Sequence, residues 1–367
     1  MVKIPDHINE LKSYKPGKPI PEIKAELGLE KVSVLWNNEN NFGPSPKAME
    51  MMRAAIENSH VYPDPTSKEL RTAIATNEGI DVEQVVVGSG SEAILSNVFQ
   101  AFFNEGDELL TSEGTFVAIY IWAKSHNVPV VKLPLTSDYR FDVEAIKASI
   151  TNKTKAIYIS NPNNPTGSII TKSEFESLMK AVPKEVIVIM DEAYYEFAAE
   201  NQDYPSSVSY GYPNVITLRT FSKVYGIAAI RIGYAMGEPR LIEALSKVRL
   251  TFEPSNLGQA AGIGALSDLD FLKKVLDNNR TELKACGELF DRLGITYIKS
   301  FANFVTLDLG SPERVNIYSD ELMKMGVFVR PLIAFGLPHC LRITIGTADE
   351  MNHFRAVFEE VHSSVFV

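Results

Sequence analysis

Cysteine, long hydrophobic runs and clustered positive charge are all scarce in this sequence of 367 residues. Only Cys286 and Cys340 occur, too few for a disulfide scaffold, and the N-terminal segment has no hydrophobic signal core, so we expect a cytoplasmic protein. No apolar run approaches the roughly 20 residues of a membrane-spanning helix, so we expect no membrane partner. The formal net charge is -10 and no Lys/Arg cluster occurs, which argues against a nucleic-acid partner.

Histidine is also sparse and dispersed along the chain. The six histidines are His7, His60, His126, His339, His353 and His362. They show neither the i,i+4 spacing nor the Cys-x-x-Cys neighbours that are typical of metal sites. The sequence therefore predicts no metal.

The order of hydrophobic segments predicts an α/β fold with two unequal domains, because single cores stop growing at roughly 250 to 300 residues. Residues 1–28 are rich in proline and lysine and are expected to form an N-terminal arm. In residues 29–262, short β-branched runs alternate with helical stretches, which predicts a large domain with a mostly parallel sheet between helices. Residues 263–367 begin with a long helix and predict a smaller α+β domain. In such folds ligands bind at the carboxyl ends of the strands.

The stretch TLRTFSKVYGIAAIRIGY (217–234) places Lys223 just after one of these predicted strands. A lysine in a loop is usually a solvated surface charge. Here the segments on both sides are apolar and the next cation is Arg231. An ammonium in low dielectric beside another cation loses basicity and gains nucleophilicity, so Lys223 is a candidate to attack a carbonyl group.

The segment VVVGSGSEAI (85–94) predicts a strand, a Gly/Ser turn and a helix start. Free backbone N–H groups and the helix dipole make such a turn a good anion site, suited to phosphate. The same letters also fit the dinucleotide pattern G-x-G-x-x-A, on Gly88, Gly90 and Ala93, and a tight strand-to-helix turn explains them equally well. The motif alone does not decide between these interpretations.

Two further strand ends carry polar side chains. In ISNPNNPTGSII (159–170) the amide of Asn164 could donate to a phenolate oxygen, although an Asx/Pro turn also explains the composition. In EVIVIMDEAYYEF (185–197) Asp191 follows a buried strand, where an unpaired carboxylate is costly. A protonated pyridine nitrogen would be a suitable partner; otherwise Asp191 caps a helix that begins at Glu192.

The segments GSGSEA, NNPTG, DEAYYEF and TFSK, with Arg231 eight residues after Lys223, occur in an order that resembles the fold type I pyridoxal 5′-phosphate aminotransferases of the class I/II group. The resemblance covers nearly the whole chain. It implies that Lys223 holds the cofactor as an internal aldimine and, once displaced by a substrate amine, moves a proton from the substrate carbon to the cofactor. Asp191 would pair with the pyridine nitrogen. A 2-oxo acid, 2-oxoglutarate, would complete a ping-pong cycle.

The same resemblance implies roles for further residues. Asn164 and Tyr194 would hydrogen-bond the phenolic oxygen of the cofactor, and Phe116 would stack on its ring. Tyr62, in HVYPDP, would reach the cofactor phosphate of the neighbouring subunit in a homodimer. The phosphate itself would be bound by Gly90, Ser91, Glu92, Thr220, Ser222 and Arg231.

Within this family the chain is most similar to the histidinol-phosphate aminotransferases, on the segments SYKPGKP, LWNNENNFGPSP, VYPDP, ANFV, RPL and LRITIG. The implied substrates are histidinol phosphate and glutamate or 2-oxoglutarate. Arg330 and Arg342 stand at matching positions, and their planar guanidinium groups suit bidentate capture of a carboxylate or a phosphate. Tyr14 and Asn40 match positions that contact substrate in this subfamily.

Two departures concern the substrate. The chain reads NENNFGP where the subfamily has N-E-N-P-x-G-P, and LTFEPSNLGQAAG, with Glu253, replaces an asparagine-rich segment. Some relatives accept phenylalanine or tyrosine, so an aromatic amino-acid aminotransferase is the alternative. A nicotinamide-dependent dehydrogenase, with Glu113 on the ribose, would leave Lys223 and Asp191 unexplained. A non-catalytic cofactor-binding protein would leave a complete set of chemical groups without use.

Overall fold

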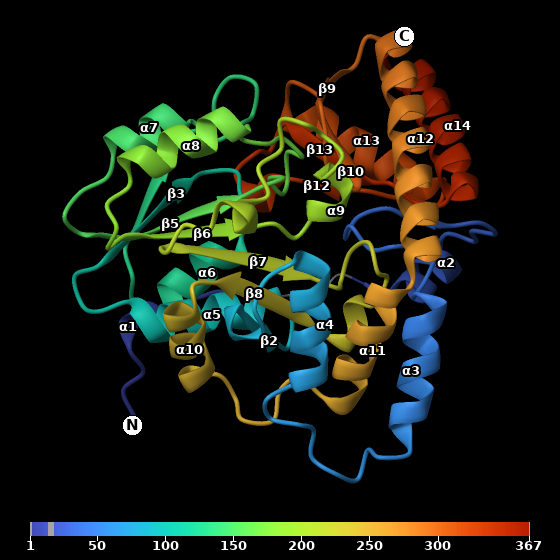
Figure 1. Cartoon of the computed structure of the whole chain (residues 1–367). Helices are drawn as coiled ribbons and strands as arrows, with labels where there is room; N and C mark the ends of the chain where they lie inside the picture. The colour runs from blue at the N-terminus through green and yellow to red at the C-terminus, as the bar shows by residue number, and fades with distance from the viewer. Residues whose placement is uncertain (1, 14–17, 367) are drawn as a thin grey trace.

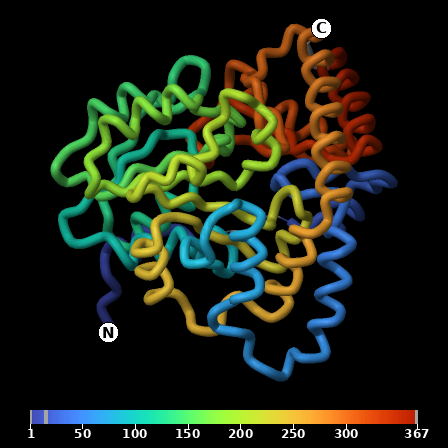
Figure 2. Tube along the Cα trace, in the orientation of Figure 1, coloured from blue at the N-terminus to red at the C-terminus, as the bar shows by residue number. Residues whose placement is uncertain are grey.

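The structure is a computed structural model that describes residues 2–13 and 18–366 (Figures 1 and 2). Tyr14, predicted to contact substrate, lies outside the described residues. The N-terminal segment contributes two short helices, α1 (Asp6–Asn9) and α2 (Ile20–Glu26). Among the described residues no helix is both long and apolar enough to cross a membrane.

A seven-stranded sheet with the strand order β2-β8-β7-β6-β5-β3-β4 forms the centre of the large part of the molecule. Its strands are β2 (Val85–Gly88), β3 (Glu108–Ser112), β4 (Val130–Leu133), β5 (Thr154–Ser160), β6 (Ile187–Asp191), β7 (Val215–Thr220) and β8 (Gly233–Gly237). Only β8 runs antiparallel to its neighbours in this sheet, so the predicted mostly parallel sheet is confirmed. The sequence analysis did not identify β8, because GYAMG begins and ends with glycine, which has low β-propensity.

Both faces of this sheet are covered by helices, as the near-continuous apolar strands require. Side chains alternate between the faces: Val188 and Met190 of β6 pack in one hydrophobic core and Ile189 in another. The covering helices are α3 (Pro46–Ile56), α4 (Lys68–Glu78), α5 (Ser91–Phe102), α6 (Ala118–Ser125), α7 (Val143–Ala148), α8 (Lys172–Ala181), α10 (Pro239–Val248) and α11 (Asn256–Ser267). Figure 1 shows α7 and α8 on the side of the sheet opposite to α5, α6 and α10.

A second sheet forms the centre of the C-terminal part. Its four antiparallel strands have the order β12-β13-β10-β9, and they are β9 (Thr296–Ile298), β10 (Phe304–Asp308), β12 (Arg330–Pro331) and β13 (Cys340–Thr344). Helices α13 (Pro312–Lys324) and α14 (Ala348–Phe366) accompany it. Their apolar faces share one core with Leu307 and Leu341 of the sheet. This is the α+β arrangement that the sequence predicted.

Helix α12 (Leu269–Leu293) connects the two parts. Its 25 residues extend about 38 Å at 1.5 Å per residue. Phe271 and Val275 near its start belong to a core of the large part, whereas Leu289 and Phe290 near its end belong to the C-terminal core. The helix ends at Gly294, whose φ of +67° is a left-handed C-terminal cap.

One segment of the N-terminal half packs with the C-terminal part. Strand β1 (Ser33–Val34) pairs in parallel with β11 (Val327–Phe328), and Leu35 is fully buried in the C-terminal core. The sequence analysis placed residues 29–262 in the large domain, whereas Ser33 to Leu35 pair and pack with the C-terminal part, and the boundary itself stays a prediction. Their pairing partner lies in the C-terminal part of the chain, far away in sequence, so the hydrophobic pattern alone could not indicate it. The remaining domain boundaries stay predictions.

Candidate active site

A cavity of about 240 Å³ opens at the carboxyl ends of β5, β6 and β7. Ten of the predicted site residues line it: Ser91, Glu92, Phe116, Asn164, Asp191, Tyr194, Thr220, Ser222, Lys223 and Arg231. Lys223 is partly buried, and its Nζ donates to the backbone oxygen of Asn37 at 3.4 Å. The same nitrogen lies 5.7 Å from the centre of the Tyr194 ring. The amine of Lys223 therefore lies in a cavity lined by hydroxyl, amide and carboxylate groups.

Asp191 ends β6 and is only 5% exposed. Its Oδ2 accepts a hydrogen bond from the Tyr158 hydroxyl at 2.7 Å, and its Oδ1 accepts one from the Ala193 N–H at 3.2 Å. No salt bridge reaches it within the described chain. Burial, opposed by these two hydrogen bonds, raises the pKa of Asp191 to about 6. Asp191 does not cap a helix that begins at Glu192, because α9 (Tyr195–Ala198) starts three residues later with Tyr194 as its N-cap.

Two hydrogen-bond donors face the cavity from neighbouring positions. The Tyr194 hydroxyl accepts from Asn38 Nδ2 at 2.9 Å, so its own proton is free to donate to a ligand. The Asn164 Oδ1 accepts from Arg342 Nη1, which leaves the amide N–H groups of Asn164 for a ligand. Both side chains are at least nine-tenths buried. Such donors suit a ligand oxygen that carries negative charge.

An anion-binding corner lies where α5 begins. Gly90 is the N-cap, with φ +94°, so the first N–H groups of the 12-residue helix α5 have no side-chain cap. A Cβ at Gly90 would lie 2.6 Å from Arg231 Nη2, hence only glycine leaves room for this guanidinium. Arg231 donates to Ser222 Oγ at 3.4 Å, and Ser222 Oγ lies 3.0 Å from Thr220 Oγ1. Helix N–H groups, hydroxyls and a cation without a carboxylate partner in the described chain form a phosphate-type site.

Arg330 and Arg342 lie beside this cavity on the C-terminal sheet. They are direct partners in the antiparallel pair β12–β13, so two like charges share one face. Arg342 is 3% exposed, donates to Asn164 and to the backbone oxygen of Trp36, and has no carboxylate partner among the described residues. Burial lowers the pKa of Arg342 to about 10, and neighbouring Arg330 acts in the same direction. The Nε atoms of both arginines are buried without a hydrogen-bond partner in the described chain.

Besides Arg330 and Arg342, which lie beside the cavity, three predicted site residues with described positions do not line it: Asn40, Gly90 and Tyr62. Asn40 donates to the Val224 oxygen at 2.7 Å and accepts from the Phe42 N–H, so its amide holds the loop that carries Lys223. Gly90 lies behind Arg231. Tyr62 is 76% exposed and stacks on Phe252 with ring centres 4.3 Å apart. The substrate role of Asn40 and the intersubunit role of Tyr62 stay predictions.

Sequence reasoning missed several residues that position this site. Tyr158 bonds Asp191, and the signal was a tyrosine within a fully buried strand, whose hydroxyl needs a partner. Asn38, with φ +56°, bonds Tyr194 and also Thr344 of β13, so it joins the two parts of the molecule at the cavity. Asn37 and Glu39 line the cavity directly.

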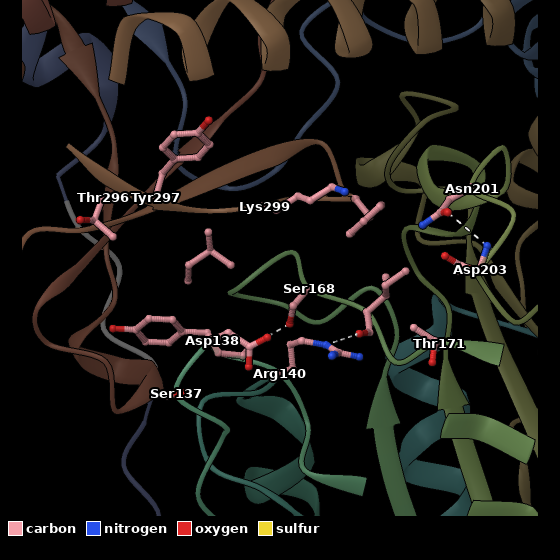
Figure 3. Close-up of a pocket in the computed structure, with 14 residues that line it drawn as sticks. Ser137, Asp138, Arg140, Ser168, Thr171, Asn201, Asp203, Thr296, Tyr297 and Lys299 are labelled. Atoms are coloured by element: carbon pink, nitrogen blue, oxygen red, sulfur yellow. Dashed lines mark hydrogen bonds between the residues drawn. The ribbon is translucent and has the colours of Figure 1, made fainter. Parts of the chain in front are cut away.

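A larger cavity, of about 440 Å³, lies between the two parts but contains none of the predicted site residues. Figure 3 shows it between Ser137–Arg140, Ser168 and Thr171 on one side and Thr296–Lys299 of the C-terminal part on the other. Its lining lacks an amine beside a buried carboxylate. The chemical groups gather in the smaller cavity.

The comparison with known proteins agrees with this geometry. The family model for aminotransferase class I and II matches residues 30–358. The chain is 40% identical to a histidinol-phosphate aminotransferase of Brevibacillus brevis, over 95% of each chain. It is 38% identical to histidinol-phosphate aminotransferase 2 of Hydrogenovibrio crunogenus, over 98% of this chain and 96% of that protein.

Solved structures are similar over the full length. A crystal structure of histidinol-phosphate aminotransferase from Sinorhizobium meliloti in complex with pyridoxal-5′-phosphate matches with a TM-score of 0.88 and 29% identity, covering 100% of this chain and 99% of that chain. An aspartate aminotransferase double mutant from Thermus thermophilus matches with a TM-score of 0.85, and its 22% identity supports the fold alone. The predicted fold type I architecture is thus confirmed.

Proposed function

The chain belongs to the class I and II aminotransferases, and from that premise we propose that it transfers an amino group between L-histidinol phosphate and 2-oxoglutarate. This is a step of histidine biosynthesis. We further propose a ping-pong cycle with pyridoxal 5′-phosphate as cofactor and Lys223 as the residue that carries it. Support for the substrate comes from the names of the most similar relatives and from the two opposed arginines beside the cavity.

The residues of the cavity fit this cofactor. Its phosphate would bind the first N–H groups of α5, Thr220, Ser222 and Arg231, where Gly90 leaves room for the guanidinium. The buried carboxylate of Asp191 forms no salt bridge in the described chain, and a protonated ring nitrogen would supply a direct cationic partner. Asn164 and Tyr194 each retain a free donor for the phenolic oxygen, and Phe116 would cover the ring.

When bound, pyridoxal phosphate supplies a protonated ring that accepts electrons from the substrate carbon next to nitrogen. The chain's own residues then have defined tasks. Lys223 Nζ is the mobile base of the cavity, since it is anchored by one long hydrogen bond to Asn37. Asp191 would pair with the ring nitrogen of the bound cofactor and favour its protonated form, and Tyr158 and the Ala193 N–H hold the Asp191 carboxylate oriented.

Arg330 and Arg342 would recognise the anionic end of each substrate. A dianion held between the two guanidinium groups would relieve the repulsion between them. The same pair can bind the phosphate of histidinol phosphate and then the distal carboxylate of 2-oxoglutarate. This pair is the single observation in the structure that supports an anionic substrate. The carboxylate of phenylalanine could also occupy it, so the preference for histidinol phosphate rests on the names of the relatives.

We also propose a homodimer with shared active sites. The stacked rings of Tyr62 and Phe252 are exposed on this chain, although aromatic rings are usually buried, and Val61 beside them is 55% exposed. A second copy that covers this surface would place Tyr62 at the partner's phosphate corner. Asn40 would act at the substrate end by holding the Lys223 loop.

The experiment is a half-reaction on the protein loaded with pyridoxal phosphate. L-histidinol phosphate and L-phenylalanine are titrated separately, and loss of the cofactor absorbance band is followed. We expect loss at far lower concentrations of histidinol phosphate, and no turnover by Lys223→Ala. The opposite order of the two amines would make this an aromatic amino-acid aminotransferase. Turnover retained by Lys223→Ala, or no cofactor band at all, would contradict the cofactor chemistry.

A further inference from the structure

A second group of ligand-type side chains lies one step along β13 from Arg342. Cys340 and Asp308 are direct partners in the antiparallel pair β13–β10. Their neighbours Leu341 and Leu307 point into the C-terminal core, so Cys340 and Asp308 lie on the other face of the sheet. That face is turned toward the large part of the molecule, because Thr306 on the same face donates to the Pro165 oxygen at 2.6 Å.

Four side chains converge there. A carboxylate oxygen of Asp308, a ring nitrogen of His339 and the sulfur of Cys340 all lie within 4.8 Å of one another. The hydroxyl of Tyr139, from the large part, lies 2.6 Å from Asp308 Oδ2 and 3.0 Å from His339 Nε2. Tyr139 has φ +63°, a conformation that bulky residues rarely adopt, so the loop is held in an unfavourable backbone region with its hydroxyl at this cluster.

We propose that Asp308, His339 and Cys340 form a Zn²⁺ site with the Tyr139 oxygen as the fourth ligand. Sulfur, imidazole and carboxylate ligands together favour zinc over magnesium or calcium, which select all-oxygen sites. A tetrahedral zinc separates its ligand atoms by about 3.3 to 3.8 Å. The Tyr139 oxygen, now 2.6 Å from Asp308 Oδ2 and 3.0 Å from His339 Nε2, would have to move away by about 0.7 and about 0.3 Å, and the other three ligands would move toward the ion.

The surroundings of the cluster offer the zinc ion a path from solvent and indicate what its binding would do to the structure. Tyr139 also lines the 440 Å³ cavity of Figure 3, which provides a path for the ion from solvent. Binding of zinc by Cys340 as a thiolate releases the thiol proton to water. The bound ion would connect the Tyr139 loop to the strand that carries Arg342. It would thus link the two parts of the molecule, which is a structural role separate from amino transfer.

The sequence could not suggest this site. Asp308 is far from His339 in the chain, and His339 and Cys340 are adjacent rather than spaced as in known zinc motifs. The register of β10 with β13 and the crossing of the Tyr139 loop bring the ligands together.

The test measures zinc directly on the cofactor-loaded protein after removal of metals with a chelator. Zinc content after dialysis and competition with a chromophoric chelator give the stoichiometry and the affinity. We expect one zinc per chain in the unmodified protein and in the matched control Cys286→Ser, whose thiol is also buried but lies elsewhere. Cys340→Ser and His339→Gln are each expected to weaken binding at least about 100-fold.

Further variants make the outcome decisive. His339 is partly exposed, so His339→Gln is expected to fold even if Cys340→Ser does not. Tyr139→Phe should weaken binding about tenfold, and tighter binding by this variant would overturn the four-ligand arrangement. The proposal is wrong if the unmodified protein holds no zinc or if His339→Gln binds zinc with unchanged affinity. The cluster is then only a hydrogen-bond network of Tyr139, Asp308 and His339. The half-reaction with histidinol phosphate is measured separately, so either proposal can fail alone.

Discussion

Asp191 and Glu192 are consecutive buried acids with opposite surroundings. Glu192, at 0% exposure, accepts from Arg219 Nε and Nη2 at 3.0 and 2.8 Å, and from Ser207. Burial lowers the pKa of Arg219, but the charges of Glu192 and Glu78 outweigh burial. The pKa of Arg219 therefore lies well above its ordinary value. Asp191 forms no salt bridge in the described chain, and burial raises its pKa to about 6 although the charge of Lys223 acts in the opposite direction.

The arginines show the same contrast. Arg219 is surrounded by two carboxylates and by the Tyr195 ring, whose centre lies 3.3 Å from Cζ. Arg342 is nearly as buried but has only neutral partners among the described residues and faces Arg330. Removing one partner of a complete buried ion pair destabilises the fold, because it leaves the other charge uncompensated. A buried charge without a counter-ion is instead a candidate for ligand binding. The paired charges of Arg219, Glu192 and Glu78 thus form a supporting cluster. Asp191 and Arg342, which have no ion-pair partner in the described chain, belong to the cavity and its edge.

The largest effect is expected from breaking the complete cluster. Glu192→Ala should lower the free energy of unfolding by about 3–5 kcal/mol, because it leaves Arg219 buried with one carboxylate fewer. Urea unfolding measures this loss. The control is Glu243→Ala, which removes an exposed pair with Lys247 and should cost less than about 0.5 kcal/mol. Equal losses in the two variants would contradict the assignment.

Removing Arg342, the buried cation beside the cavity, should lower kcat/KM and leave the free energy of unfolding nearly unchanged. Arg342→Met is expected to lower kcat/KM for histidinol phosphate by roughly 100- to 1,000-fold, or about 3–4 kcal/mol, since the anion loses its buried partner. The free energy of unfolding should change by less than about 1 kcal/mol, because no ion pair is broken. Steady-state kinetics beside urea unfolding tests both. Arg280→Met, an exposed arginine paired with Glu200, should change neither, and a large stability loss in Arg342→Met would erase the contrast with Arg219.

The carboxylate of the cavity should destabilise the cofactor-free protein in a pH-dependent way. The folded-state pKa of about 6 exceeds the ordinary 3.8, so between these values the folded protein binds more protons than the unfolded chain. Stability therefore falls as pH rises through this window, and the penalty is complete above about pH 6. Asp191→Asn removes it and should gain up to about 3 kcal/mol at about pH 7.5, and little at about pH 4.

The measurement is urea unfolding of cofactor-free protein at both pH values. In the Asp191→Asn variant the Tyr158 hydroxyl can still donate to the amide oxygen of the new side chain, so Asp191→Ala serves as a second variant without this bond. A loss of stability in Asp191→Asn at the higher pH would contradict this prediction. It would mean that Asp191 has a cationic partner in the folded protein, as Glu192 has in Arg219.

Local segments were enough to predict much of the cavity. Lys223, Asp191 and Asn164 each follow a strand that is recognisable by its own β-branched run, and the N–H groups of Ser91 and Glu92 open a helix after a glycine turn. The carboxyl ends of parallel strands meet at one edge, so these residues converge in any sheet of this type. Here the local pattern around each residue is sufficient.

The alternation of strands and helices and the chemical groups at the strand ends can thus be predicted from local sequence. The pairing of the buried charges follows from the three-dimensional arrangement of distant segments. Arg219 meets Glu192 and Glu78, Asn38 reaches Tyr194, and Arg330 stands opposite Arg342 because of strand register and contacts between distant segments. The physical reason is that burial and counter-ions depend on partners far away in the chain, about which local periodicity carries no information.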